Sequence, residues 1–146
     1  MMNLDMIMST DLKTVSPKDN LAAVRKIMQE NRIHHVPVVN EDNGLVGLVT
    51  LSDVLAATDS ILRDDESRLH AREIKVEDIM VRNLATIDEN ASLRQAALFL
   101  ESHGIGCLPV VTDGNLRGIV TDTDFVGVAI NLLEQIEESE PMDEAL

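Results

Sequence analysis

Two aspartates follow a threonine at the same spacing, in Thr50-x-x-Asp53 and Thr121-x-x-Asp124. Each pair comes directly after an apolar run, where a strand should end and a helix begin. A carboxylate can accept two hydrogen bonds from a vicinal diol, and such charge-assisted bonds are the stronger kind. The same pattern is also a helix-capping signature, in which the hydroxyl and the carboxylate bond to backbone N–H groups. The pattern alone favours the cap, and the two roles are compatible.

The remaining reactive side chains do not form a catalytic set. His34 and His35 are adjacent and could donate hydrogen bonds to an anion, but they lack the His-x-x-x-His spacing of a zinc site. Cys107 is the single cysteine, and no partner base is indicated for it, so it is interpreted as a small core residue. There is no glycine-rich loop of the Walker type. We therefore predict no metal site, no required cofactor and no enzymatic activity.

Both Thr-x-x-Asp pairs lie at the end of a longer repeat. At an offset of 72 residues the copies match at Met8 and Met80, at Thr14 and Thr86, and at Pro37-Val-Val and Pro109-Val-Val. One residue is lost in the following turn, so the offset becomes 71, and Gly47, Thr50 and Asp53 meet Gly118, Thr121 and Asp124. The chain is a tandem duplication, and each copy is one supersecondary unit.

Each copy is predicted to form a strand, a helix, two strands and a helix. In the first copy these elements are a short extended piece at 13–15, an amphipathic helix at 21–31, strands at 36–39 and 45–50, and a helix from 51. The second copy repeats them with an extended piece at 85–87, a helix over 93–100, two strands joined by a turn at 112–115, and a helix at 124–137.

These elements divide the chain into four parts. Residues 1–60 form the first repeat, 61–73 a charged and partly helical connector, 74–136 the second repeat, and 137–146 an acidic tail. The last helix is apolar around most of its circumference, which is more than one monomer face could cover. That excess predicts a homodimer. The side chains expected to form its surface are Val54, Leu55, Phe125, Ile130, Leu133 and Ile136.

Composition excludes several classes of function. The formal charge is −14, which argues against nucleic-acid binding, because that binding depends on Lys and Arg neutralising phosphates. Apolar residues make up 45% of the chain, which is enough for a packed core. The N-terminus lacks the pattern of a signal peptide, and no apolar stretch is long enough to cross a bilayer. We expect a cytoplasmic protein with no membrane partner.

The repeat resembles a tandem pair of CBS (cystathionine β-synthase) domains, the arrangement called a Bateman module. The features that carry this resemblance are the leading Met8 and Met80, the Thr-hydrophobic pairs, the Pro-Val-Val strands and the Gly-x-x-Thr-x-x-Asp ends, over roughly residues 4 to 133. The resemblance implies an α/β (α+β) fold. It consists of two β-α-β-β-α repeats related by a pseudo-two-fold axis, with two clefts between them.

Similarity to this family also implies a ligand and a role for each residue. Members commonly bind AMP, ADP, ATP or S-adenosylmethionine in these clefts. Asp53 and Asp124 match the ribose-binding aspartate, and Thr50 and Thr121 match positions that face phosphate or ribose. The backbone of Thr14-Val15 and of Thr86-Ile87 would lie beside the adenine.

The resemblance also places basic side chains near phosphate. His34 and His35 match positions that reach the phosphate of a nucleotide held mainly by the other repeat, so they should face the cleft of Asp124. The equivalent Gly106 and Cys107 carry no charge, which predicts weaker phosphate binding in the Asp53 cleft. Further candidates near the clefts are Arg32 and Arg117 as donors and Asp122 as an opposing charge.

The implied function is a free-standing regulatory sensor. It would bind an adenosine-containing ligand and signal to a separate, unknown effector enzyme or transporter. It would also form a homodimer through its helices. The alternative is a protein-interaction module whose clefts are degenerate and whose dimer surface carries the function.

Overall fold

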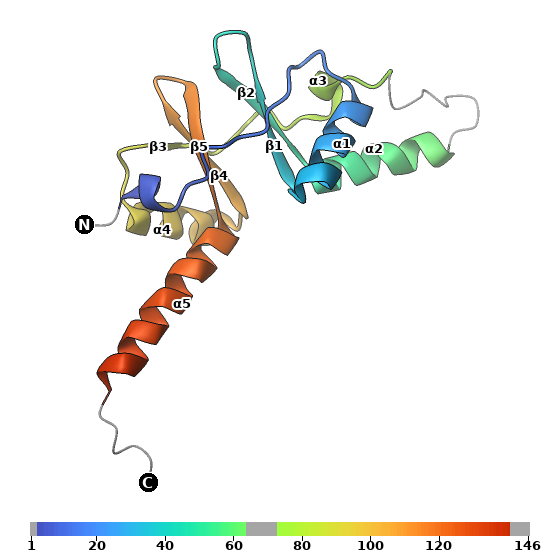
Figure 1. The fold of residues 1–146 in the computed structure, drawn as a ribbon. Coiled ribbons are helices and arrows are strands. Elements are labelled where there is room, and N and C mark those ends of the chain that lie inside the picture. The colour runs from blue at the N-terminus through green and yellow to red at the C-terminus, as the bar shows by residue number, and fades with distance from the viewer. Residues whose placement is uncertain (1–2, 64–72, 141–146) are drawn as a thin grey trace.

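The computed structural model of the chain describes residues 3–63 and 73–140 (Figure 1). Two small sheets, each with its own helices, make up a mixed α and β protein. Figure 1 shows the two sheets as neighbouring hairpins, with the helices of each repeat on the far side of its own sheet. The predicted α+β fold with two repeats of one unit is confirmed.

The first repeat contains α1 (Leu21–Asn31), β1 (His35–Val39), β2 (Leu45–Thr50) and α2 (Leu51–Arg63). β1 and β2 pair antiparallel. The predicted leading strand is reduced to one parallel bridge, in which Val15 N–H donates to Pro37 O (3.0 Å) and Val39 N–H donates to Val15 O (2.9 Å).

The second repeat contains β3 (Ile87–Asp88), α4 (Leu93–His103), β4 (Cys107–Thr112), β5 (Asn115–Thr121) and α5 (Asp122–Ser139). β3 lies parallel to β4, and β4 pairs antiparallel with β5. α5 begins at the end of β5 and projects away from both sheets (Figure 1).

Local sequence explains where the helices begin and end. Asn20 caps α1, because its Oδ1 accepts a hydrogen bond from Ala23 N–H (2.9 Å). Ser92 and Gln95 form a reciprocal capping box at the start of α4. α4 ends at Gly104, whose φ of +59° is the left-handed conformation that glycine adopts without strain.

The two hairpin tips pair with each other across the repeats. Leu45 N–H donates to Gly114 O (3.0 Å), and Leu116 N–H donates to Asn43 O (3.1 Å). Asp113 and Gly114 both have positive φ, as a tight two-residue hairpin turn requires. These turns therefore link the two repeats.

The first residues of each repeat, called its leading segment below, pack on the other repeat. The 3-10 helix η1 (Leu4–Met6) places Leu4, fully buried, in the core of the second repeat. The short helix α3 (Val76–Ile79) places Val76, fully buried, in the core of the first repeat. Neither helix was predicted, because three or four residues are too few to show a helical period.

Backbone hydrogen bonds also attach each leading segment to the opposite repeat. Ser9 and Ile119 bond reciprocally through N–H and C=O, at 2.9 and 3.0 Å. Val81 and Leu48 do the same in the pseudo-symmetric position, at 2.8 and 3.0 Å. Each leading segment thus extends the edge of the opposite sheet and joins the two repeats.

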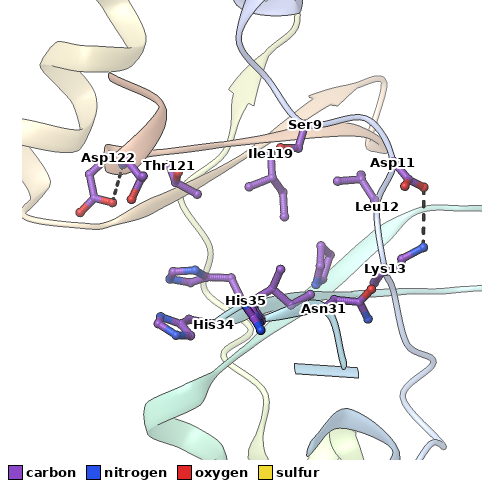
Figure 2. A pocket seen from close by; sticks show the side chains of 14 residues that line it. Ser9, Asp11, Leu12, Lys13, Asn31, His34, His35, Ile119, Thr121 and Asp122 are labelled. Carbon is purple, nitrogen blue, oxygen red and sulfur yellow. Dashed lines mark hydrogen bonds and ion pairs between the residues drawn. The ribbon is translucent and has the colours of Figure 1, made fainter. Parts of the chain in front are cut away.

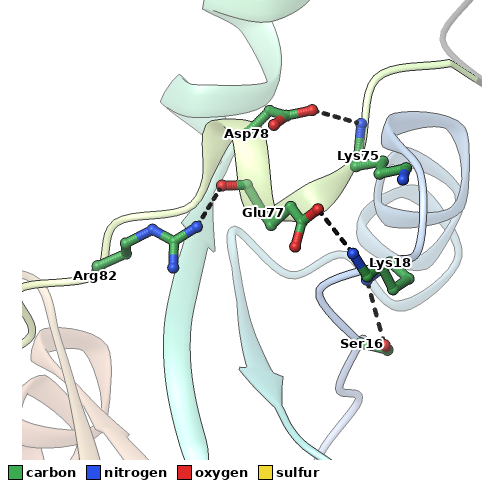
Figure 3. Close-up of polar contacts among 6 residues, drawn as sticks. All are labelled: Ser16, Lys18, Lys75, Glu77, Asp78 and Arg82. Atoms are coloured by element: carbon green, nitrogen blue, oxygen red, sulfur yellow. Dashed lines mark hydrogen bonds and ion pairs between the residues drawn. The ribbon is translucent and has the colours of Figure 1, made fainter.

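Polar contacts also hold α3 against the first repeat (Figure 3). Lys18 Nζ of the first repeat lies 3.2 Å from Glu77 Oε1 of α3, whereas Arg82 donates to the Glu77 carbonyl oxygen (3.1 Å) within the same segment as α3. An exposed ion pair of this kind contributes only about 0–1 kcal/mol. The buried Val76, whose N–H donates to Asp19 O (2.7 Å), therefore fixes α3 more strongly than the charges do.

Two helices extend beyond the repeats predicted to contain them. α2 continues to Arg63, which is inside the predicted connector, and α5 runs from Asp122 to Ser139, into the predicted acidic tail. Glutamates favour helix once one has begun, so their charge did not end α5. Residues 64–72 and 141–146, the rest of the connector and tail, lie outside the described residues. The repeat boundaries at 60 and 74 stay a prediction.

No helix in residues 3–63 and 73–140 is both long and apolar enough to cross a membrane. The cytoplasmic location stays a prediction.

A substitution at Gly118 tests the close contact between each leading segment and the opposite sheet. A Cβ at this position would lie 2.8 Å from Met8 Sδ and 2.9 Å from the backbone oxygen of Ser9. We expect Gly118→Ala to lower the free energy of unfolding in urea by about 1–3 kcal/mol, because the backbone must move.

Gly127→Ala is the matched control for Gly118→Ala. Gly127 lies within α5, and a Cβ there would meet nothing within 4 Å. This variant should be more stable than the wild type by about 0.5–1 kcal/mol. A Gly118→Ala protein as stable as the wild type would show that the segment is not packed as described.

Candidate functional site

The larger cleft lies between the two repeats and has a volume of about 530 Å³. Three parts of the chain line it: the N-terminal segment, the turn from α1 into β1, and the junction of β5 with α5 (Figure 2). The lining residues are Ser9, Asp11, Leu12, Lys13, Asn31, Arg32, Ile33, His34, His35, Pro37, Ile119, Thr121, Asp122 and Thr123.

The predicted phosphate-binding side chains come together in this cleft. His34 and His35 lie across it from Thr121 and Asp122 in Figure 2. Arg32 also lines the cleft, as the sequence suggested, whereas Arg117 lines neither this cleft nor the smaller one described below. His34 is exposed and His35 is half-buried, so both can be reached from solvent.

Sequence reasoning missed Lys13, which lines the same cleft. Its Nζ lies 3.7 Å from Asp11 Oδ1 on the wall formed by the N-terminal segment (Figure 2). The signal that could have found it is the repeat itself, because the matching residue of the second copy is Ala85. In formal charge, Lys13 and Arg32 balance Asp11 and Asp122 in this lining.

The two Thr-x-x-Asp pairs do form helix caps. Asp124 Oδ2 accepts from Thr121 N–H (2.9 Å), and Thr121 Oγ1 accepts from Asp124 N–H (3.4 Å). Asp53 Oδ2 accepts from both the N–H and the hydroxyl of Thr50, at 2.8 and 2.9 Å. Within the described residues neither Oδ1 accepts a hydrogen bond, so each carboxylate keeps one oxygen for a ligand.

A smaller cleft of about 240 Å³ occupies the pseudo-symmetric position. It is lined by His35, Leu48, Thr50, Val81, Asn83, Leu84, Ala85, Ile105, Gly106, Cys107 and Pro109. Thr50, Gly106 and Cys107 are thus grouped here, while Thr121 and the histidine pair are grouped in the larger cleft. His35 contributes to the walls of both.

The other sequence candidates lie beside the clefts instead of lining them. Asp53 and Asp124 are half-buried, one helical turn into α2 and α5, next to the lining threonines. Val15 is 4% exposed, and both its backbone groups bond to β1, which leaves the backbone of Thr14 as the available group. Thr86 is exposed, and Ile87 is half-buried in β3.

Burial shifts the pKa of two residues that line the smaller cleft. It lowers the pKa of His35 from its ordinary value; neighbouring His34 adds to this effect and Asp122 opposes it. Burial, with Asp122 and Asp124, raises the pKa of Cys107 to about 12. The Cys107 thiol therefore stays protonated near neutral pH and is a poor nucleophile.

A sequence model of the CBS domain matches residues 4–60 and 76–131. A CBS domain-containing protein of Dictyostelium discoideum is 34% identical over 134 residues, covering 89% of this chain and 92% of that protein. The inosine-5'-monophosphate dehydrogenase of Bifidobacterium longum is 36% identical over 121 residues. That match covers 82% of this chain but 21% of the enzyme. The same unit thus occurs both as most of a protein and as a minor part of an enzyme.

Solved structures share the whole fold. A Vibrio cholerae protein assigned to acetoin utilization (AcuB) is 37% identical, with a TM-score of 0.80, covering 97% of this chain and 99% of that one. CBSX2, solved in complex with AMP, is 26% identical with a TM-score of 0.76, covering 90% and 98%. The CBS domain pair of protein MJ0100, solved with 5'-methylthioadenosine and S-adenosyl-L-methionine, is 26% identical with a TM-score of 0.74, covering 88% and 99%.

The lowered pKa of His35 predicts a pH dependence of stability. The folded chain binds this proton less tightly than the unfolded chain, so the stabilisation is present above the ordinary histidine pKa of about 6.5 and is lost as pH falls. Between about pH 7.5 and 5.5, the wild type should lose more unfolding free energy in urea than His35→Gln. Equal losses in the two proteins would show that His35 is not buried as described.

Proposed function

Since the chain belongs to the CBS domain family, we propose that it is a regulatory module that binds an adenosine-containing ligand between its repeats. The observation that carries this proposal is the larger cleft. There, Lys13, Arg32 and the histidine pair face the Thr121 end of α5 across a space of about 530 Å³. Donors for an anion thus lie on one side of the cavity, and α5, which carries the Asp124 carboxylate suited to a diol, begins on the other side.

The ligands of related structures support the adenosine class. CBSX2 was solved with AMP, and the MJ0100 pair with 5'-methylthioadenosine and S-adenosyl-L-methionine. These molecules share adenine and ribose and differ in what the ribose 5' position carries. Asp124 and the backbone of Thr14 would bind the shared ribose and adenine. The variable group at the 5' position would lie beside the charged lining residues, such as Lys13 and Arg32.

Each residue predicted to bind a ligand in or beside the larger cleft then has a role. Asp124 Oδ1 accepts hydrogen bonds from the ribose hydroxyls while Oδ2 continues to cap α5. Thr121 lies beside the ribose or phosphate, and the backbone of Thr14 lies beside the adenine. His34 and His35 donate to phosphate. In the second cleft, Asp53, Thr50 and Thr86-Ile87 take the corresponding ribose and base positions.

The proposed role is regulatory and not catalytic. The Cys107 thiol is protonated, and residues 3–63 and 73–140 contain no cluster of His, Cys, Asp or Glu that could hold a metal ion. Ligand binding would be read by an effector enzyme or transporter, either as a separate protein or as a further part of a longer chain.

Exposed apolar side chains support a homodimer. α5 has no buried residue, and its Val126, Ile130, Leu133 and Ile136 are each at least half exposed. Leu55 on α2 is exposed in the same way, but Val54 (3% exposed) and Phe125 pack in the cores of their own repeats, so these two were wrongly predicted for the dimer surface. An apolar surface of this kind marks an interface in most proteins. It also favours the second candidate function, a protein-interaction module that needs no ligand.

Thermal unfolding with added ligand tests the proposed function. A ligand that binds only the folded form, at a hundred times its dissociation constant, adds about 2.7 kcal/mol. At roughly 2–4 °C per kcal/mol, or somewhat more for a chain of this size, AMP should raise the melting temperature by several degrees. An unchanged melting temperature with millimolar AMP, ADP, ATP and S-adenosylmethionine would favour the interaction module.

Calorimetry on a matched pair of variants assigns that binding to a carboxylate. Asp124→Asn keeps the shape of the side chain but removes the charge-assisted bonds, and should weaken AMP binding by roughly tenfold. Asp53→Asn makes the same change beside the smaller cleft and should leave AMP binding nearly unchanged. A loss seen only with Asp53→Asn would contradict the assignment.

Light scattering tests the proposed homodimer. The wild type should have about twice the chain mass of 16.1 kDa at micromolar concentration. Leu133→Glu places a charge on the exposed apolar face of α5 and should return the mass to that of one chain. A monomeric wild type would overturn the proposal.

A further inference from the structure

The two clefts share one apolar frame. Leu12, Ile33 and Pro37 of the larger cleft correspond by the repeat to Leu84, Ile105 and Pro109 of the smaller one. Each cleft also contains the threonine that caps the following helix. The apolar surface and the hydroxyl offered to a ligand are thus nearly the same in both.

The charged groups of the two clefts differ at each matching position. Where the larger cleft has Lys13, the smaller has Ala85, and where the larger has Asp11, the smaller has Asn83. The histidine pair is replaced by Gly106 and Cys107. The difference therefore includes both cations and carboxylates, and it does not result from a single substitution.

The smaller cleft has little charge of its own near neutral pH. Its lining includes two titratable groups, Cys107 and His35. The pKa of Cys107 is raised to about 12, and the pKa of His35 is lowered, so both are mainly neutral there. The volume of this cleft is less than half that of the larger one.

A phosphate group would bind poorly in such a cleft. Removing an anion from water is costly unless a cation or several donors replace the lost hydration. Among residues 3–63 and 73–140 no such cation lines the smaller cleft, and the chain as a whole carries a formal charge of −14, which repels anions. An uncharged ligand avoids this cost and still buries its apolar surface against the shared frame.

We propose that the two clefts select ligands of different charge. The larger cleft binds a phosphorylated adenosine, and the smaller cleft binds an uncharged adenosine-type nucleoside. This inference rests on the proposed function, since both ligands share the adenosine part. The module would then bind a phosphorylated adenosine and an uncharged nucleoside at the same time.

Amide NMR titrations of the full chain with AMP and with adenosine test the inference. The amide of His34 reports on the larger cleft, and that of Gly106 on the smaller one. At His34, AMP should bind at least about tenfold more tightly than adenosine, because charged donors contact its phosphate. At Gly106 the order should reverse, with adenosine at least about tenfold tighter than AMP.

Exchanging the residues at one matching position tests the cause. Ala85→Lys should tighten AMP binding at the smaller cleft by roughly tenfold, and Lys13→Ala should weaken it at the larger cleft by a similar factor. Adenosine binding should be unchanged in both. Ala85→Met adds a chain of similar length without charge, and should leave AMP binding at the smaller cleft weak.

The outcomes separate the inference from the proposed function. AMP binding equally well in both clefts, or adenosine failing to shift the Gly106 amide while AMP shifts that of His34, would overturn the inference alone. No shift in either cleft with AMP, adenosine or S-adenosylmethionine would overturn both. Reversed preferences at the two amides, together with the gain in Ala85→Lys, would establish the inference.

Discussion

The structure depends on the packing of the leading segment of each repeat on the sheet of the other repeat. Backbone hydrogen bonds join Ser9 to Ile119 and Val81 to Leu48. Each of these bridges holds the leading segment of one repeat along the sheet of the other. These bridges provide the third wall of each cleft, since the residues that follow Ser9 and Val81 line the larger and the smaller cleft. Both clefts are therefore products of the duplication, and neither repeat could form one alone.

A duplicated frame allows the two clefts to differ without any change of fold. The groups that build the frame are apolar side chains and backbone bridges, which the copies share. The groups that would meet a ligand project from this frame, and Lys13 against Ala85 shows that they have diverged. Gly106 and Cys107 keep the smaller cleft uncharged, while His35 lies in the walls of both clefts and connects them.

Sequence alone could predict most of this architecture, because the repeat shows in strands and helices long enough to carry a period. The family resemblance also predicted that His34 and His35 face the cleft of Asp124, which is a pairing between repeats that no local pattern contains. The sequence could not predict η1 and α3, which are too short to show a period and are fixed by tertiary burial. Lys13 was missed because a single lysine in an extended segment looks like an ordinary exposed residue.

A crystal structure of the chain grown with saturating AMP is the most direct test of the central claim that the larger cleft binds an adenosine-containing ligand. We expect electron density for AMP in that cleft, with the ribose hydroxyls at hydrogen-bond distance from Asp124 and the phosphate beside His34 and Lys13. Density for AMP only in the smaller cleft beside Thr50, or in neither cleft at saturating concentration, would contradict it.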